Sequence, residues 1–286
     1  MGTEQIGAGQ GNDGAGRVQG ASSGQGTGQG AVVTSPANAA AGNGASLGLA
    51  LVTGGASGMG RSTVEQLARD RFKVILVDRN GPLAEQEAAS LREQGLDVDA
   101  RAIDLTDEHA VRAMVRELPP LRALVNNAGL FDERKFLDVT SDDFRRIYEI
   151  NLVAVATLTQ EAARKMEDGA RIVNIASRAY LGAKNHPHYV ASKAAVVGYT
   201  RASAMELAPR GILVNAIAPG LIDTPILQAL TPERLASQLS LQPTGKAGRP
   251  EDIARAVSFL VSPTMGFITG QVLFVDGGKS LGGSGS

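Results

Sequence analysis

Residues 49–70 read LALVTGGASGMGRSTVEQLARD, and this stretch decides the fold. An apolar run that suits a buried strand comes first, a glycine-rich turn follows, and an amphipathic helical pattern ends the stretch. Gly54 and Gly58 let the backbone approach a pyrophosphate without a clash at Cβ, and Gly60 lets the helix begin close to the sheet. The first turn of such a helix presents unpaired N–H groups and partial positive charge to phosphates. The order of elements predicts a dinucleotide site, with a purely structural glycine turn as the alternative.

A second glycine-rich match lies near the N-terminus, where residues 9–14 read GQGNDG and satisfy the dinucleotide pattern G-x-G-x-x-G letter for letter. No strand pattern precedes this match and no helical pattern follows it, and the motif carries meaning only between those two elements. Residues 1–45 also offer too little apolar surface to offset backbone ordering, which costs about 1–2 kcal/mol per residue. We therefore predict a disordered Gly-rich tail over residues 1–45, an accidental match within it, and a flexible C-terminus over residues 282–286.

The composition limits the classes of function. The chain has 286 residues, 43% of them hydrophobic, so it can build a sizeable core. It has no cysteine, which excludes a disulfide framework, a thiolate nucleophile and a cysteine-ligated metal, and we predict no metal site. A net charge of −1 gives no field that attracts nucleic acid or an anionic membrane. No apolar run reaches the roughly 18 residues of a membrane span, and no signal peptide is evident. We expect a cytoplasmic protein that binds small molecules.

From residue 47 onward, short β-branched runs alternate with segments of 3.6-residue periodicity. This alternation is typical of a parallel sheet with helices on both faces, and short right-handed crossovers lead to a Rossmann-type strand order. We therefore predict a single α/β domain over residues 46–281, a doubly wound parallel sheet of seven strands flanked by helices. The predicted strands are 47–53, 73–78, 98–104, 121–127, 171–177, 211–219 and 271–276, and the clearest helices cover 59–70, 82–94, 141–166 and 189–208.

An acidic residue, Asp78, ends the second predicted strand. At that place a carboxylate accepts hydrogen bonds from the ribose hydroxyls of adenosine and repels a 2′-phosphate. Asp78 therefore favours NAD over NADP as the cofactor. The neighbouring Arg79 leaves NADP open, because a guanidinium that turned inward would bind the 2′-phosphate.

The stretch HPHYVASKAAVVGYT (186–200) places Tyr189 and Lys193 four residues apart, on one face of a predicted helix. A free tyrosine, with a pKa of about 10, is a poor base near neutral pH. A lysine ammonium one turn away stabilises the phenolate and lowers that pKa, as does the positive charge of an oxidised nicotinamide ring. Tyr and Lys at this spacing also occur on ordinary amphipathic helices. The pair alone therefore leaves both a catalytic and a structural interpretation open.

Together these residues resemble the short-chain dehydrogenase/reductase family in its form of roughly 250 residues, over about residues 46–279. The resemblance rests on several motifs in the family's order. They are TGGASGMG with Asp78, DLTD (104–107), NNAG (126–129), Asn151, Ser177, YVASK (189–193), APGLIDT (218–224) and GQVLFVDGG (270–278).

The resemblance implies four catalytic residues. Tyr189 would be the general acid or base that exchanges a proton with the substrate oxygen, and Ser177 would hold that oxygen by a hydrogen bond. Lys193 would lower the pKa of the tyrosine and grip the nicotinamide ribose. Asn151 would anchor a water that links Lys193 to solvent, with a buried polar residue at a helix irregularity as the alternative. The hydride would pass between substrate and nicotinamide.

The same resemblance implies a set of cofactor contacts around the glycine turn, the adenine, the ribose and the carboxamide. For Asn126 a purely structural role, tying neighbouring strands together, is equally open. The implied contacts are Gly54, Ser57, Gly58, Met59, Gly60, Asp78, Asp104, Leu105, Asn126, Ala128, Gly129, Tyr189, Lys193, Pro219, Gly220, Ile222 and Thr224.

Residues 222–245 form a predicted lid, because the amphipathic segment 226–243 follows a break in structure next to the cofactor motifs. Apolar residues of this segment, with Leu130, Phe131, Leu181 and Ala183, predict a pocket for a lipophilic or alicyclic secondary alcohol or ketone, although the same side chains would also suit a sealed core. The family resemblance also implies a homo-oligomer, a tetramer or a dimer, built on the helices that begin near residues 141 and 189.

Two other functions stay open. The first is an NADPH-dependent 3-oxoacyl-thioester reductase, in which basic residues of 133–135 and 145–146, with Arg178, would dock an acidic carrier protein; Asp78 counts against it. The second is a catalytically silent dinucleotide sensor, against which the intact catalytic set stands. His186 and His188 lack the carboxylate partner of a metal site, and we expect both in a solvated loop, with His188 near enough to touch substrate.

Overall fold

The computed structural model describes residues 45–282. Nearly all of the predicted tail, including its GQGNDG match, and nearly all of the predicted C-terminal extension lie outside these residues. The described part contains one seven-stranded sheet whose strands all run parallel, in the order β3-β2-β1-β4-β5-β6-β7. The predicted doubly wound α/β fold is therefore confirmed.

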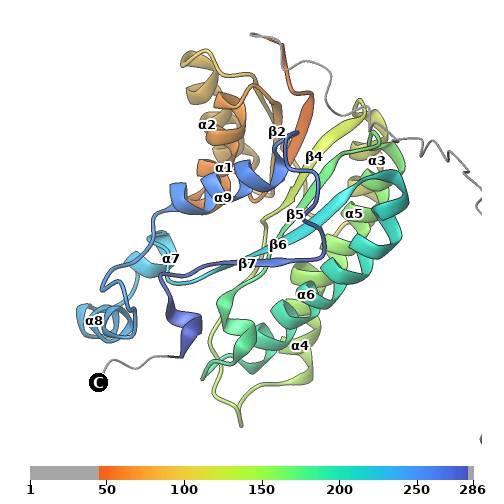
Figure 1. The fold of residues 1–286 in the computed structure, drawn as a ribbon. Coiled ribbons are helices and arrows are strands. Elements are labelled where there is room, and N and C mark those ends of the chain that lie inside the picture. The colour runs from red at the N-terminus through yellow and green to blue at the C-terminus, as the bar shows by residue number, and fades with distance from the viewer. Residues whose placement is uncertain (1–44, 283–286) are drawn as a thin grey trace, which may run out of the picture. The chain divides into compact units, whose positions relative to one another are not determined.

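All seven predicted strands form, each within two residues of the expected start and end. Their carboxyl ends lie along one edge of the sheet, because the strands are parallel (Figure 1). The strands are β1 (Leu49–Thr53), β2 (Lys73–Asp78), β3 (Val98–Ala102), β4 (Leu121–Asn126), β5 (Arg171–Ile175), β6 (Leu213–Pro219) and β7 (Val272–Val275).

Helices cover both faces of the sheet (Figure 1). On one face α1 (Gly58–Arg69), α2 (Gly81–Glu93) and α9 (Pro250–Val261) bury Val64, Leu67 and Leu91 against the strands. On the other face α3 (Glu108–Glu117), α5 (Ala154–Lys165) and α6 (Pro187–Leu207) enclose a second apolar core with Leu124 and Leu158. Burial on both faces explains why the central strands read as continuous apolar runs.

The helix predicted over 141–166 forms as three pieces. Residues Ser141–Tyr148 are the α-helix α4, Glu149–Val153 are a π-helical turn (η2), and α5 follows at Ala154. In the π-turn the N–H of Ala154 donates to the carbonyl of Glu149, five residues earlier. Such turns insert one residue into a helix and are frequent at functional sites.

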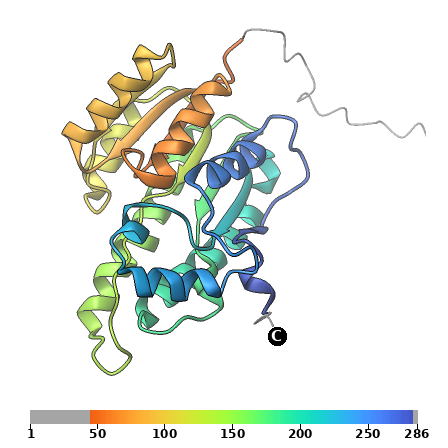
Figure 2. The same ribbon diagram turned by 90° about the vertical axis from the view of Figure 1, so that its left-hand side faces the viewer.

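The segment predicted as a lid contains two short helices, α7 (Pro225–Gln228) and α8 (Pro232–Ser240). Its first residues join the body through a parallel bridge between Ile222 and Gly248. Arg234 of α8 forms an ion pair with Glu133 of the β4–α4 segment at 2.8 Å, which ties the two segments together. Figure 2 shows the ribbon from the side of α8.

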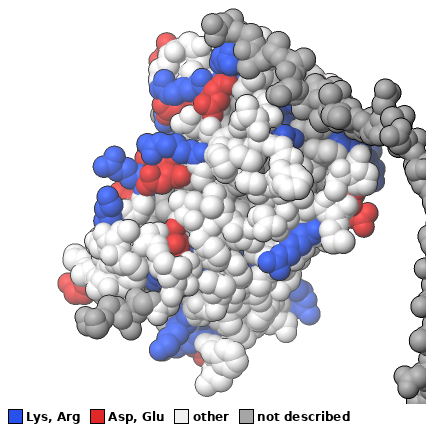
Figure 3. All heavy atoms as spheres, viewed as in Figure 1, with Lys and Arg blue, Asp and Glu red and all other residues white. Residues whose placement is uncertain are grey.

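Charged residues of both signs share the surface. On the face shown in Figure 3, Lys and Arg lie beside Asp and Glu, and large areas carry no charge. No helix within residues 45–282 is long and apolar enough to cross a membrane.

Candidate active site

A cleft of about 460 Å³ opens at the carboxyl ends of the central strands. Its walls come from the glycine turn after β1, the end of β2, the residues after β3 and β4, and the start of α7. The lining residues are Gly54, Ser57, Gly58, Met59, Gly60, Val77, Asp78, Arg79, Ile103, Asp104, Leu105, Thr106, Asn127, Ala128, Gly129, Leu130, Ile150, Thr224 and Pro225. Most of the cofactor residues implied by the sequence therefore lie together in one cleft.

The glycine turn is built so that only glycine fits. Gly54 and Gly58 have φ angles of +63° and +52°, which side chains disfavour. A Cβ on Gly60 would lie 2.0 Å from the carbonyl oxygen of Gly54, so this helix can begin against the turn only with glycine there. Ser57, the residue before α1, makes no side-chain capping bond, which leaves the first N–H groups of the helix for an anion.

Asp78 lies at the end of β2, in the cleft wall. Its carboxylate accepts hydrogen bonds from the backbone N–H groups of Ala56 (3.2 Å) and Asn80 (3.0 Å), which hold it beside the glycine turn. Arg79 also lines the cleft, and it is exposed. Hydrogen bonds from the backbone N–H and the hydroxyl of Thr106 lower the pKa of Asp104, and the positive charge of Arg79 lowers it further. The cleft thus presents two carboxylates and one cation at its β2–β3 end.

The two asparagines at the end of β4 have different surroundings. Asn126 is buried, and its amide donates to Asn174 (2.8 Å) and to Thr159 (3.0 Å), which ties β4 to β5 and α5. Asn127, which the sequence analysis did not single out, lines the cleft and donates to the carbonyls of Thr53 (2.9 Å) and Gly54 (3.2 Å). Asn127 therefore holds the glycine turn, whereas Asn126 joins β4 to its neighbours.

Tyr189 and Lys193 lie one turn apart near the start of α6, with the ammonium nitrogen 5.9 Å from the centre of the tyrosine ring. The Lys193 ammonium donates to the carbonyl of Ile175 at 2.8 Å. Lys193 is 5% exposed, and this burial lowers its pKa from 10.5 to about 8. The lysine therefore remains largely protonated near neutral pH while it is poised to exchange a proton.

Tyr189 is only partly exposed. Burial raises its pKa, and a hydrogen bond with the Ser177 hydroxyl offsets part of that rise. The ring of Phe131 packs edge-on against the Tyr189 ring, with centroids 5.0 Å apart, and the His186 ring packs at 5.9 Å. Ser177 lies two residues after the end of β5, so a central strand places its hydroxyl beside the phenol.

Asn151 lies in the π-turn and is fully buried. Its side chain accepts from the N–H of Leu130 (2.7 Å), and its amide donates to the Leu130 carbonyl and to the Ser192 hydroxyl, both at 3.0 Å. A Cβ on Gly129 would lie 3.2 Å from Asn151 Oδ1 and 3.3 Å from Lys193 Nζ. Asn151, Lys193 and the cleft wall therefore meet at Gly129.

Three other implied cofactor residues, at the end of β6 and just after it, do not line the cleft. Pro219 ends β6, and Gly220 follows where a Cβ would lie 2.6 Å from the Asp276 backbone. Ile222 is 7% exposed and packs into the core, whereas Thr224 does line the cleft. The segment after β6 thus contributes a close backbone approach and one lining side chain.

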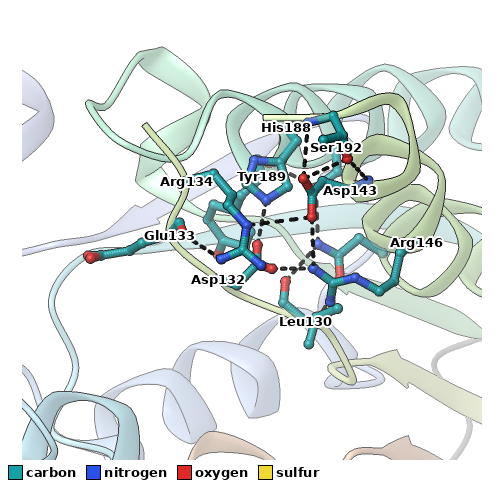
Figure 4. Close-up of polar contacts among 11 residues, drawn as sticks. Leu130, Asp132, Glu133, Arg134, Asp143, Arg146, His188, Tyr189 and Ser192 are labelled. Atoms are coloured by element: carbon teal, nitrogen blue, oxygen red, sulfur yellow. Dashed lines mark hydrogen bonds and ion pairs between the residues drawn. The ribbon is translucent and has the colours of Figure 1, made fainter. Parts of the chain in front are cut away.

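The expectation of solvated histidines is wrong for His188. This side chain is fully buried, and its Nε2 contacts the carboxylate of Asp132, a partner that the sequence analysis did not identify (Figure 4). His186 is partly buried, and burial lowers its pKa. No group of three or more metal-binding side chains that could hold an ion occurs within residues 45–282.

The three arginines of residues 133–146 are paired with acids. Arg146 contacts Asp132, Arg145 lies 2.5 Å from Asp142, and Arg134 lies 3.6 Å from Asp143. These guanidinium charges are therefore largely balanced within the chain.

Comparison with known proteins agrees with this arrangement. Residues 54–280 match a family model described as enoyl-(acyl carrier protein) reductase. The chain belongs to the short-chain dehydrogenase/reductase family. Members of this family are oxidoreductases that act on CH–OH groups with NAD(P), so the chain is an enzyme of that kind.

Two curated relatives of this short-chain dehydrogenase/reductase cover most of its length. It is 39% identical to the (2S)-[(R)-hydroxy(phenyl)methyl]succinyl-CoA dehydrogenase subunit BbsD of Thauera aromatica, over 82% of this chain and 96% of the relative. It is 40% identical to the cyclopentanol dehydrogenase of Comamonas testosteroni, over 80% of this chain and 95% of the relative.

Among solved structures, the short-chain dehydrogenase/reductase from Serratia marcescens BCRC 10948 superimposes with a TM-score of 0.78 at 35% identity. The match covers 82% of this chain and 98% of that one.

Proposed function

We propose that this enzyme is an NAD-dependent dehydrogenase of lipophilic or alicyclic secondary alcohols, with Tyr189 as the acid or base. The observation that carries the proposal is the meeting of Tyr189, Ser177 and Lys193 behind a cleft whose wall is a glycine turn. The implied dinucleotide fits the residues present, because a bare helix N-terminus and side-chain-free backbone at Gly54 and Gly58 suit a pyrophosphate.

Asp78 supports NAD as the preferred cofactor. Its carboxylate lies in the cleft wall, held by two backbone N–H groups, where it would accept bonds from ribose hydroxyls and repel a 2′-phosphate. Arg79 is exposed and lies near Asp104, whose carboxylate would compete with a 2′-phosphate for the guanidinium. Glycine-turn residues, Asp78 and the segments after β3 and β4 would hold the dinucleotide.

The chain's own residues would manage the proton. When bound, the nicotinamide supplies a hydride acceptor. The Tyr189 phenolate would take the hydroxyl proton of the alcohol while the Ser177 hydroxyl holds the same oxygen. The nearby Lys193 ammonium would favour the phenolate over the phenol, because a positive charge within about 6 Å stabilises an anion. Asn151, fixed beside Gly129, would position a water next to Lys193 through which the proton leaves.

The substrate class follows from the apolar surroundings of the phenol. The Phe131 ring lies against Tyr189, and Leu130, the residue before it, lines the cleft. Leu227 of α7 is buried, and it lies close in sequence to the lining residues Thr224 and Pro225. Such surfaces favour a ring or an alkyl chain over a heavily hydroxylated sugar. The relative named cyclopentanol dehydrogenase supports this class.

The alternative is a thioester substrate, as in an NADPH-dependent 3-oxoacyl-thioester reductase. The matched family model names an acyl carrier protein reductase, and one relative is named for a CoA thioester. Against carrier-protein docking, the arginines at 134, 145 and 146 are paired with Asp143, Asp142 and Asp132. Arg178 remains as a basic residue beside Ser177 for an acidic group.

We also propose a homo-oligomer, a tetramer or a dimer, in the cytoplasm. Two exposed apolar side chains, Val153 in the π-turn before α5 (37%) and Met205 on α6 (79%), support burial against other subunits. Light scattering on the purified protein would measure the oligomeric state, and a monomer at all concentrations would contradict this part of the proposal.

The experiment that tests the function begins with separate titrations of the protein with NADH and NADPH. The preferred cofactor is then used to assay cyclopentanol, longer secondary alcohols and hydroxyacyl thioesters. We expect tighter NADH binding and oxidation of the alicyclic and lipophilic alcohols. In Tyr189→Phe, turnover should fall by about 10²–10⁴-fold with NADH binding unchanged, because only the acid or base is removed.

The two other outcomes are distinct. Tighter NADPH binding with reduction of 3-oxoacyl thioesters would replace the proposal with the alternative. Full turnover in Tyr189→Phe would refute the assignment of the proton-transfer residue.

A further inference from the structure

A cluster of charged and aromatic side chains lies close to Tyr189, with a buried histidine at one end and an exposed arginine at the other (Figure 4). His188 precedes Tyr189 on α6 and is fully buried, and its Nε2 contacts the Asp132 carboxylate. The other oxygen of Asp132 contacts Arg146 of α4. We name this set, His188, Asp132 and Arg146, the clamp. It joins the start of α6, the β4–α4 segment and α4.

The polar groups of the clamp residues pair with one another. The Asp132 contact places the imidazole proton on Nε2, and the Nδ1 atom is buried with no partner among residues 45–282. Phe144 of α4 covers the imidazole, with ring centroids 6.0 Å apart. Burial raises the pKa of Asp132, but hydrogen bonds from His188 and Arg146 outweigh it and the net shift is downward. Asp132 is therefore an ionised bridge between a helix start and a neighbouring helix.

The clamp holds a segment that makes two contacts with the proposed catalytic residues. Phe131, next to Asp132, packs edge-on against the Tyr189 ring at 5.0 Å. Leu130, the next residue back, is bound through both its N–H and its carbonyl by the Asn151 side chain. A displacement of Asp132 would therefore move a wall of the Tyr189 site and the partner of Asn151 together.

We propose that His188 is a positioning residue, which fixes the Phe131 wall on Tyr189 through Asp132 and Arg146. This inference rests on the proposed role of Tyr189. The Phe131 ring packs against the Tyr189 ring and so limits the access of water to the phenol from that side. Charged and titratable groups around the phenol and the clamp are Lys193 and His186 on the α6 side, Asp132 on the β4–α4 segment, and Arg146 and Asp143 on α4.

The test compares four variants. His188→Leu removes the donor at similar size, His188→Gln returns an N–H near the position of Nε2, and Arg146→Ala removes the far end of the clamp. Arg145→Ala is the matched control, because Arg145 is on the same helix but pairs with the exposed Asp142 only. Thermal unfolding establishes whether each variant is folded. Because Arg146 is exposed, Arg146→Ala should fold, and it can carry the test if His188→Leu does not.

Two quantities are measured on each variant. The first is turnover with the alcohol found for the wild type. The second is the pH midpoint of phenolate absorbance from Tyr189, isolated by subtracting the same variant carrying Tyr189→Phe. The chain has four tyrosines and no tryptophan, which keeps this difference spectrum simple. The second quantity needs no substrate, so it decides the inference even if the proposed function is wrong.

We expect His188→Leu and Arg146→Ala to shift the Tyr189 midpoint to lower pH, because water reaches a phenol that burial had protected. Turnover should fall on the order of tenfold to a hundredfold, as displacement of reacting groups does, while NADH affinity stays within about twofold. His188→Gln should recover most of both values, and Arg145→Ala should match the wild type. If His188→Leu and Arg146→Ala are folded and keep the wild-type midpoint of Tyr189, the inference is wrong, whatever their turnover.

Discussion

Replacing Lys193 by Met should make the cofactor-free protein more stable at neutral pH, although it removes a proposed catalytic group. Lys193 is 5% exposed, and burial lowers its pKa from 10.5 to about 8. The unfolded chain therefore binds more protons than the native state between these two values. Below pH 8 the buried ammonium therefore lowers the free energy of unfolding by its full amount, and this destabilisation disappears as the pH rises from 8 toward 10.5.

The magnitude follows from the shift. A difference of about 2.5 pKa units corresponds to about 3.4 kcal/mol of destabilisation by the buried ammonium at low pH. The cost is still about 3.3 kcal/mol at pH 7 but only about 1.4 kcal/mol at pH 9.5. Met loses the bond to the Ile175 carbonyl, worth about 1 kcal/mol. Lys193→Met should therefore gain about 2 kcal/mol at pH 7, and this gain should nearly vanish at pH 9.5.

Urea unfolding of both proteins at the two pH values measures this gain. Lys165→Met is a matched control, because Lys165 also donates to backbone carbonyls, those of Arg116 and Leu118, from a half-buried position. That variant should be less stable than the wild type at pH 7. The reasoning is refuted if Lys193→Met is less stable than the wild type at pH 7, or if the difference between them is the same at both values.

Three further predictions concern the cleft and the sheet. Gly60→Ala should abolish NADH binding in calorimetry, because the new Cβ would lie 2.0 Å from the Gly54 carbonyl oxygen; wild-type affinity would contradict the described turn. Asp78→Ala should raise the use of NADP relative to NAD in steady-state assays, and an unchanged ratio would show that this carboxylate does not read the ribose. Asn126→Ala should lower the free energy of unfolding by about 1–3 kcal/mol, since it leaves Asn174 without its donor, while NADH affinity stays unchanged; the reverse pattern would make Asn126 a cofactor contact.

Much of the fold was predictable because its signals are local. The glycine turn of residues 53–60 lies between a strand pattern and a helical pattern, and the match at residues 9–14 lies between neither. Seven apolar runs with helical segments between them were enough to predict a parallel sheet, and all seven strands are present. The spacing of Tyr189 and Lys193 likewise predicts a shared helix face, which α6 provides.

The clamp was not predictable in the same way. His188 and Asp132 are 56 residues apart, and neither belongs to a repeating pattern, so no local signal pairs them. His188 reads as a polar residue next to a proline and suggests a loop, yet it lies in the first turn of α6 beneath Phe144. Burial of a polar side chain depends on a distant partner, and a single sequence does not reveal that partner.

The roles of Asn126 and Asn127 were only partly predictable from the sequence. Asn126 ends β4 and Asn127 follows it, and the shared motif does not say which of the two faces the cleft. Successive residues of a strand point to opposite faces, so at most one of the two can face a given side. Counting that alternation from the buried Leu124 would have placed Asn126 with the second core, as the structure does, and would have directed attention to Asn127.

The π-turn at Glu149–Val153 constrains how this enzyme can be shortened. In a regular α-helix one extra residue would turn everything beyond it by about 100°, but a π-turn takes up that residue locally. Deleting one residue here would therefore give a regular α-helix in which Ile147 before the turn and Leu158 after it still face their present cores. The same deletion would displace the buried amide of Asn151, which binds both the N–H and the carbonyl of Leu130. A one-residue deletion at this place should therefore preserve the packing of the helix and disturb the candidate active site.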